Sequence, residues 1–179
     1  MKNSEMKSTD RESQMKNNPL HKLFTDGLRD ALWAEEHLHK SLSKMQAGAT
    51  SKELSDVLET HRSETTGHVQ KLKEVFESIG ESPRAVKCEA MESLLQEATD
   101  LMDKYKEGSM VRDAALILGA QKIEHYEIAS YGSLATFADL MGHKKAKSLL
   151  GEILEEEKAA DEKLSRIAES FVNESALKE

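Results

Sequence analysis

From residue 84 to residue 179 the chain contains no proline, and its two prolines, Pro19 and Pro83, both precede that stretch. Proline ends or kinks helices and is common in turns, so a long stretch without it favours long helices over a β fold with many turns. Aromatic residues, which are enriched in strands, make up only 4% of the chain. The sequence therefore predicts an all-α fold.

Apolar residues recur with helical spacing in four long segments, at about 20–46, 51–80, 109–140 and 143–173. A shorter helical pattern lies within 82–108, between the second and third segments. Short links make helices antiparallel neighbours, whereas a long connection permits a crossover along the bundle. We therefore predict a ferritin-like four-helix bundle with one long crossover that carries an extra short helix. An up-down-up-down bundle with an appended helix is the competing topology.

The length of 179 residues fits one domain of ordinary size. Residues 1–18 lack the apolar core of a secretory signal, and their mixed charges and amides predict a disordered leader. We expect the helical bundle domain to extend over 19–173 and a disordered tail to follow at 174–179.

Acidic residues outnumber basic ones by 33 to 25, which gives a net charge of −8. This balance argues against a nucleic acid or an anionic membrane surface as the partner. No apolar run approaches the roughly 18 residues that a membrane span requires. The single cysteine, Cys88, excludes an intramolecular disulfide and a cysteine-based metal cluster, and the default expectation is a cytoplasmic location.

Each long helical segment places acidic side chains within its own apolar stripe. Eight residues share such a position near the middle of a segment: Glu35; His61, Glu64 and His68; Glu124 and Glu127; Glu157 and Asp161. A buried carboxylate is costly unless it is paired, protonated or bound to a cation. Four segments with the same exception call for a common cause, and carboxylate and imidazole groups suit iron or manganese. The stripes therefore predict a dinuclear metal site.

The acidic positions also repeat between the two halves of the chain. Glu35 and Glu64 are 29 residues apart, and Glu127 and Glu157 are 30 residues apart. The predicted metal ligands are Glu35, Glu64, His68, Glu127, Glu157 and Asp161, with His61 and Glu124 as additional ligands or as residues that support them. Two iron ions per site are expected, with manganese as the alternative metal.

Three segments resemble the bacterial YciE/YciF family of ferritin-like stress proteins. Their sequences are HRSETTGHV at 61–69, RDAALILGAQKIEHYEIASYG at 112–132 and LEEEKAAD at 154–161. The likeness covers nearly everything from about residue 20 to residue 170. It implies a ferritin-like bundle similar in core architecture to rubrerythrin, a homodimer and a link to stress responses.

The wider ferritin-like pattern places one Glu on each of two helices and Glu-x-x-His on each of the other two. Here a glycine and an alanine occupy the third position after Glu64 and Glu157. The potential ligands His68 and Asp161 come one residue later, which moves each about a third of a turn around its helix. This departure argues against rapid oxidase or ferroxidase turnover.

The leading functional hypothesis is a stress-associated protein whose dinuclear non-haem centre reacts with oxygen or peroxide; as an enzyme it would be a di-metal oxidoreductase. One alternative is a non-catalytic metal-binding protein. Another is a structural helical interaction protein whose buried acids pair with Lys122, His125 or His61.

Other polar residues are expected to have ordinary roles. The run of three glutamates at 155–157 is typical of a solvated face, with only Glu157 on the stripe. We expect surface positions for His21 and His143, and packing or structural roles for Tyr126, Tyr131 and Cys88.

Overall fold

The computed structural model describes residues 18–179, and every element in this range is helical. The elements are α2 (Pro19–Gly48), α3 (Lys52–Ser78), α4 (Glu89–Lys104), α5 (Met110–Leu140), α6 (Lys144–Ile167), the π-helical segment η1 (Ala168–Val172) and α7 (Asn173–Leu177). This confirms the predicted all-α fold. The predicted leader falls outside the described residues apart from Asn18, whose side chain accepts a hydrogen bond from the Leu20 N–H at 2.8 Å and caps α2.

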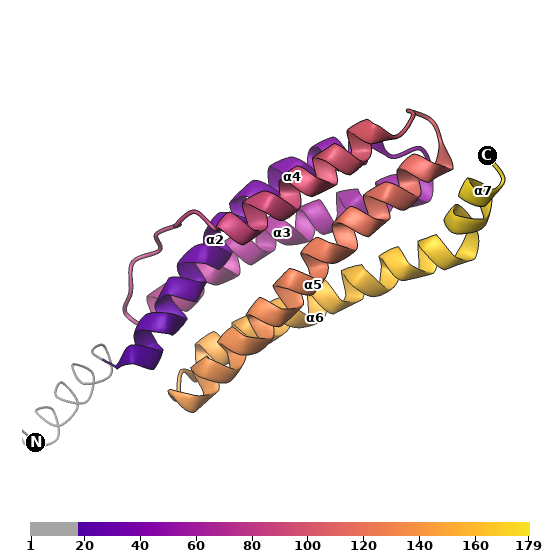
Figure 1. The fold of residues 1–179 in the computed structure, drawn as a ribbon. Helices are drawn as coiled ribbons and strands as arrows, with labels where there is room; N and C mark the ends of the chain where they lie inside the picture. Colours follow the sequence, from indigo (N-terminus) through magenta and orange to yellow (C-terminus); the bar gives the residue numbers. More distant parts are fainter. Residues whose placement is uncertain (1–17) are drawn as a thin grey trace, which may run out of the picture.

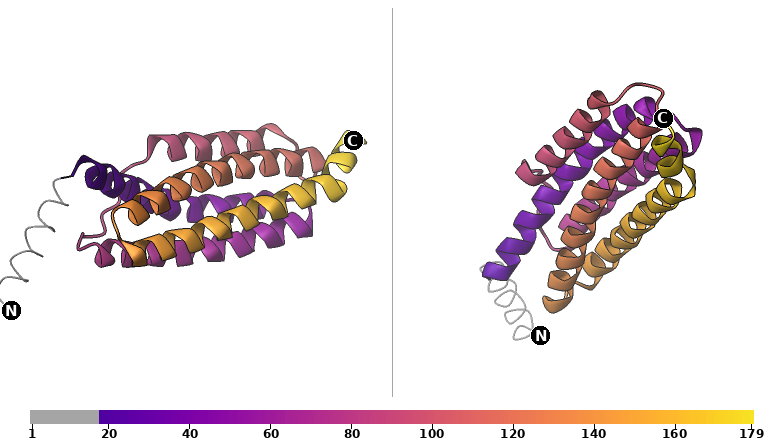
Figure 2. Two further views of the ribbon diagram at one scale, coloured as in Figure 1. Left: turned by 90° about the horizontal axis from the view of Figure 1, so that it is seen from below. Right: turned by 45° about the vertical axis from the view of Figure 1, so that its right-hand side comes forward.

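The four long helices form a bundle of two antiparallel hairpins, α2 with α3 and α5 with α6 (Figure 1). The connection between the hairpins contains α4, which runs back along the bundle and packs on α5 and α2 (Figure 2). As a result α3 and α5 run in the same direction. This is the predicted ferritin-like wiring with one long crossover.

Local sequence explains where these helices begin and end. Ser51 and Ser109 cap α3 and α5, because each side chain accepts a hydrogen bond from an N–H of the first turn. Gly80 and Gly142, with φ of 70° and 76°, follow α3 and α5 in the left-handed conformation that glycine adopts without steric cost. The chain can therefore reverse direction at these points.

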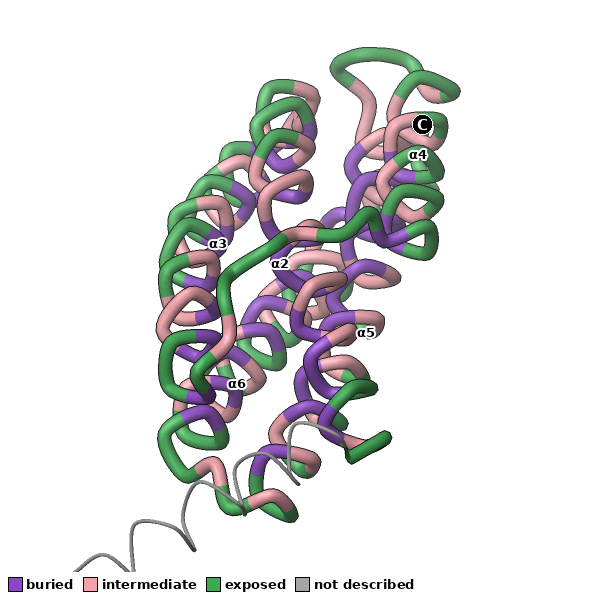
Figure 3. Tube along the Cα trace, turned by 90° about the vertical axis from the view of Figure 1, so that its left-hand side faces the viewer, coloured by how far each residue is buried: buried purple, intermediate pink, exposed green. Residues whose placement is uncertain are grey.

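The core consists of two apolar clusters separated by a layer of polar side chains. One cluster includes Leu42, Leu58 and Leu116, towards the end where α4 ends and α5 begins. The other includes Phe24 and side chains such as Phe76, Leu134 and Leu150 towards the opposite end. Buried residues follow the inward faces of the helices through both clusters (Figure 3). The polar layer is therefore enclosed by apolar packing along the bundle axis.

The carboxyl-terminal end differs from the predicted disordered tail at 174–179. After α6 the chain continues through η1 into α7, and Val172 is fully buried against the first apolar cluster. The Glu179 carboxylate accepts hydrogen bonds from the backbone N–H groups of Met110 and Val111, in the first turn of α5. An anion at a helix amino terminus is favourable, which gives this segment a defined position.

Within residues 18–179, no helix combines the length and the apolar character that crossing a membrane requires.

The buried carboxylate of Asp113 ties the α2–α3 turn to α5. Its two oxygens accept hydrogen bonds from the backbone N–H groups of Thr50 and Ser51 at 2.6 and 2.7 Å. We expect Asp113→Ala to lower the free energy of unfolding by about 2–4 kcal/mol, because it leaves two backbone donors without an acceptor. Urea denaturation would measure this, with Asp103→Ala on the exposed face of α4 as the control. A loss no greater than that of the control would contradict the proposed tie.

Candidate metal centre

Six titratable side chains form the polar layer in the middle of the bundle. They are Glu35 on α2, His61 and His68 on α3, Glu124 and Glu127 on α5, and Glu157 on α6, and each residue is at most 3% exposed. We call this set the buried layer. It brings together residues that are far apart in the sequence, on all four long helices.

The buried layer contains two groups with the spacing of metal ligands. The first is His61, Glu124, Glu127 and Glu157, and the second is Glu35, His68 and Glu157. Within each group the potential ligand atoms lie within 4.8 Å of one another. Because Glu157 belongs to both groups, the arrangement suits two neighbouring cations that share one carboxylate.

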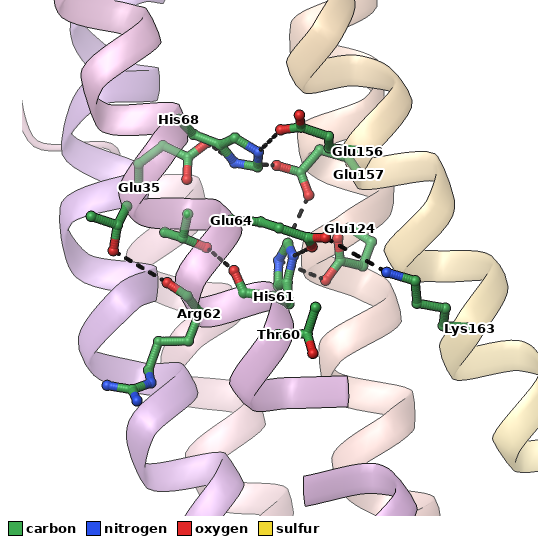
Figure 4. Close-up of polar contacts among 12 residues, drawn as sticks. Glu35, Thr60, His61, Arg62, Glu64, His68, Glu124, Glu156, Glu157 and Lys163 are labelled. Carbon is green, nitrogen blue, oxygen red and sulfur yellow. Dashed lines mark hydrogen bonds and ion pairs between the residues drawn. The ribbon is translucent and has the colours of Figure 1, made fainter. Parts of the chain in front are cut away.

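The contacts of Glu157 show how it joins the two groups (Figure 4). One oxygen, Oε1, lies 3.0 Å from His68 Nδ1, and the other, Oε2, lies 3.6 Å from His61 Nε2. His68 Nδ1 is also 3.3 Å from Glu35 Oε1, and His61 Nε2 is 3.2 Å from Glu124 Oε1. Each histidine therefore directs one ring nitrogen at the carboxylates of its own group.

The other ring nitrogen of each histidine faces a carboxylate that is only partly buried. His68 Nε2 lies 2.7 Å from Glu156 Oε2, and the second oxygen of Glu156 accepts a hydrogen bond from Lys71 at 2.7 Å. His61 Nδ1 lies 3.6 Å from Glu64 Oε2, whose partner oxygen is 3.6 Å from Lys163 Nζ. A carboxylate behind a histidine fixes the ring orientation and the tautomer, as is usual for metal-binding histidines.

Tyr131 supports the second group from α5. Its buried hydroxyl donates a short hydrogen bond to Glu35 Oε1. One oxygen of Glu35 is therefore held in place, and Oε2 has no hydrogen-bond partner in the protein.

Many polar atoms of the buried layer lack a hydrogen-bond partner in the protein. Both carboxylate oxygens of Glu127, both of Glu157 and both ring nitrogens of His61 are in this state. Buried polar atoms are nearly always paired, and each unpaired one costs about 1–3 kcal/mol. Lone pairs converging on two points are what bound cations would satisfy, so the residues present fit a metal pair.

The charge of the buried layer leads to the same conclusion. Four carboxylates face two histidines, so a negative excess remains even when both histidines are protonated. Lys122 pairs with Glu97 at 2.5 Å at the surface, and the exposed His125 lies 3.4 Å from Asp161, so neither compensates the layer. Two divalent cations with neutral histidines would balance four carboxylates.

The pKa values show how the protein compensates part of this charge by itself. Burial opposes protonation of His61 and His68, but the surrounding glutamates outweigh it and raise the two pKa values to about 9 and about 11. Burial raises the pKa of Glu124 and of Glu127 well above the usual range, and the neighbouring carboxylates add to the shift. For Glu157 burial is outweighed by His68 and His61, which lower its pKa. The metal-free layer therefore holds protons where cations would sit.

Four of the six predicted ligands lie within the two groups: Glu35, His68, Glu127 and Glu157. The structure also places His61 and Glu124 there, in the first group. Glu64 borders the layer behind His61. Asp161 lies outside both groups, because it is four residues, about 6 Å, beyond Glu157 along α6. It accepts a hydrogen bond from Gln121 at 3.2 Å instead.

Three residues have surroundings that differ from those predicted from the sequence. Glu156 contacts His68 rather than forming part of a solvated face, because the α3–α6 interface lies beside it. Tyr131, for which a packing role was expected, contacts Glu35, and its position four residues after Glu127 on the same stripe could have indicated this contact. His21 is buried beside His143, with ring centroids 5.9 Å apart, where the ends of three helices meet.

A four-helix bundle with one crossover and a buried carboxylate–histidine layer defines the class of ferritin-like proteins with a candidate metal site. The chain belongs to the DUF892 family, described as a domain of unknown function, which matches residues 19–177. It is 44% identical to the protein YciF of Escherichia coli K12 over 155 residues, which cover 86% of this chain and 93% of that protein. The resemblance to the YciE/YciF family is thereby confirmed.

Solved structures agree with this assignment. The crystal structure of the E. coli stress protein YciF matches with a TM-score of 0.83 and 43% identity, over 87% of this chain and 98% of that one. The protein YcfI from Rhodopseudomonas palustris matches with a TM-score of 0.80 and 38% identity, over 83% and 94% of the two chains.

The raised pKa values predict an unusual pH dependence for metal-free protein. The contribution of His61 and His68 to stability is complete below the unfolded-state pKa of 6.5 and is lost as the pH rises through about 9 and about 11. The ionised forms of Glu124 and Glu127 disfavour the fold, and that penalty decreases as the pH falls towards their raised pKa values. We therefore expect the chelated protein to become more stable as the pH falls from 9 to 6.5.

Urea denaturation at a series of pH values, with chelator and with divalent metal, would measure this dependence. In the metal-loaded sample the same fall in pH should lower stability, because protons compete with the cations for the ligands. The lowered pKa of Glu157 opposes the trend only near and below its ordinary value of 4.5. Equal slopes in the two samples would show that the layer does not bind the metal.

Proposed function

We propose that this chain binds a dinuclear non-haem metal centre, of iron or manganese, in the buried layer. The observation that carries the proposal is the sharing of Glu157 between two buried groups whose remaining members have unpartnered oxygens or nitrogens. Three carboxylates and a histidine would hold one ion, and two carboxylates and a histidine the other. The donor set of oxygen and imidazole nitrogen suits iron and manganese.

The surrounding residues would position these ligands. Glu156 and Glu64 orient His68 and His61 from the side facing solvent. The Tyr131 hydroxyl holds Glu35 and keeps a proton beside the second group. The apolar clusters on either side limit the entry of water, which strengthens every electrostatic interaction within the layer.

We further propose that the protein acts in a stress response by reacting with peroxide or oxygen. The E. coli relative is described as a stress protein, and this supports the biological part of the proposal. A bound pair of redox-active ions supplies the two electrons that reduction of a peroxide requires. From the family resemblance we propose a homodimer as the working form, and the cytoplasm remains the default location expected from the sequence.

Metal loading tests the proposal directly. Anaerobic loading with ferrous or manganous ion, followed by removal of free metal and elemental analysis, should give about two ions per chain, one for each group. Glu157→Gln should reduce this to less than one, because the change replaces one of the two shared oxygens with an amide NH2 and removes a negative charge that both groups share. Glu155→Gln, an exposed change of the same kind on the same helix, should leave the stoichiometry unchanged. Less than one ion per wild-type chain would overturn the proposal.

A second prediction concerns the sign of a stability change. Both oxygens of Glu127 are buried without a partner, and burial together with three other carboxylates makes the ionised form of Glu127 unfavourable. In chelated protein Glu127→Gln should therefore raise the free energy of unfolding by about 1–3 kcal/mol. In metal-loaded protein the same change should lower it, because a ligand is lost.

Thermal melts of Glu127→Gln, with metal and with chelator, would reveal this reversal. Glu155→Gln should change neither sample. Destabilisation of Glu127→Gln in both samples would show that Glu127 pairs with a cationic side chain of the protein, as the interaction-protein alternative requires.

A further inference from the structure

A cavity of about 170 Å³ lies between α2 and α5, beside the buried layer. The cavity lies beside the amino-terminal end of α4. Cys88, which caps that end, contacts the hydroxyl of Tyr126, one of the cavity-lining residues, at 3.0 Å. At its mouth Leu23 and Ser133 are exposed. Farther in, the cavity reaches Glu127, which is 2% exposed and has no hydrogen-bond partner in the protein.

The walls of the cavity are mainly apolar and are kept apart by small residues. Leu134 and Phe137 form one side, and Ala31 and Ala34 leave space on the side of α2. Gly27 also leaves space on this side, because a Cβ atom at that position would lie only 2.9 Å from Leu134 Cδ2. The result is an apolar passage with a polar inner end.

Size and charge limit what this cavity can hold. A cavity of about 150 Å³ is known to accept benzene, so this one has room for about six to eight carbon atoms. Of the described residues that line it, none is cationic, whereas Asp30 and Glu127 are acidic. A carboxylate or phosphate ligand would be repelled, and a hydrophobic ammonium ion would have to lose its hydration among apolar walls. The cavity therefore suits an uncharged, mainly hydrocarbon molecule.

We propose that this cavity binds a small alkyl hydroperoxide, with its hydrocarbon part between α2 and α5 and its hydroperoxy group at Glu127. The inference rests on the proposed function, because Glu127 belongs to the first group of candidate ligands. Reduction of the hydroperoxide breaks its O–O bond and gives the alcohol and water. It consumes two protons and two electrons, and oxidation of two ferrous ions to ferric ions supplies the electrons. Hydrogen peroxide has no hydrocarbon part, so contact with the apolar walls would add nothing to its binding free energy.

Ser130 provides a variant that fills the cavity with little risk to the fold. Its hydroxyl lines the cavity and donates only to the Tyr126 carbonyl within α5, so Ser130→Leu breaks no contact between helices. Ser133→Leu, at the exposed mouth, is a second variant. Thr136→Leu is the matched control, since Thr136 is exposed on α5 and does not line the cavity.

Binding is tested on the full chain, metal-free and loaded with manganous ion, by calorimetric titration with 1-hexanol, hexanoate and hexylamine. We expect saturable binding of one hexanol per chain, at least tenfold weaker binding of the two charged molecules, and at least tenfold weaker hexanol binding to Ser130→Leu or Ser133→Leu. The control should match the wild type. Equal binding of hexanoate or hexylamine, or no effect of either filling variant, would overturn the proposal. Hexanol binding that weakens as protein concentration rises would show instead that a second copy of the chain covers the cavity.

A single-turnover experiment addresses the reaction. With ferrous protein, the rate of iron oxidation by hexyl hydroperoxide relative to that by hydrogen peroxide should fall at least tenfold in Ser130→Leu and stay unchanged in Thr136→Leu. An unchanged ratio in Ser130→Leu would show that the cavity does not select the substrate. If two ions load but hexanol does not bind, only this inference fails. If hexanol binds but no metal loads, the proposed function fails while the cavity remains a binding site.

Discussion

Four carboxylates buried close together in the middle of the bundle are the constraint on which the rest of the structure depends. Burying an ionised group without a compensating charge costs several kcal/mol of folding free energy, about as much as the net stability of many domains. The two apolar clusters on either side supply the packing that holds the four helices together around this layer. Burial and the neighbouring carboxylates raise the pKa values of Glu124 and Glu127, so that protons neutralise part of the buried charge, and bound cations would neutralise it more completely.

The layer also explains the positions of residues that are not part of it. Each histidine of the buried layer has an inward nitrogen among carboxylates and an outward nitrogen facing Glu64 or Glu156. Those two glutamates are in turn paired with Lys163 and Lys71, so that each chain of contacts ends at a cation near the surface. Because Glu64 and Glu156 are only partly buried and each is paired with a lysine, they orient the two imidazole rings without adding an uncompensated charge to the buried layer.

Apolar periodicity predicted the four long helices and the short helix between them, and the lengths of their links favoured the crossover over the competing up-down-up-down topology. The exceptions to that periodicity predicted Glu35, Glu127, Glu157 and His68 correctly as members of one cluster, because a stripe reports the direction of a side chain around its helix. It does not report depth along the axis, and for this reason Asp161 was expected closer to the layer than it lies. Contacts made across an interface between helices, such as Glu156 with His68, depend on how the helices pack. The carboxyl-terminal helix likewise depends on its docking against the start of α5.

The division of the ligand groups between the two hairpins has a consequence for folding order. The first group takes one residue from the α2–α3 hairpin and three from α5–α6, and the second takes two and one. Neither hairpin contains a complete group, so both groups come into existence only when the hairpins dock. Contacts between residues so distant in sequence form late, after local helical pairing. A metal ion bound in this layer would therefore report the final docking step, and its removal by a chelator would be expected to weaken the association of the hairpins before it affected either hairpin itself.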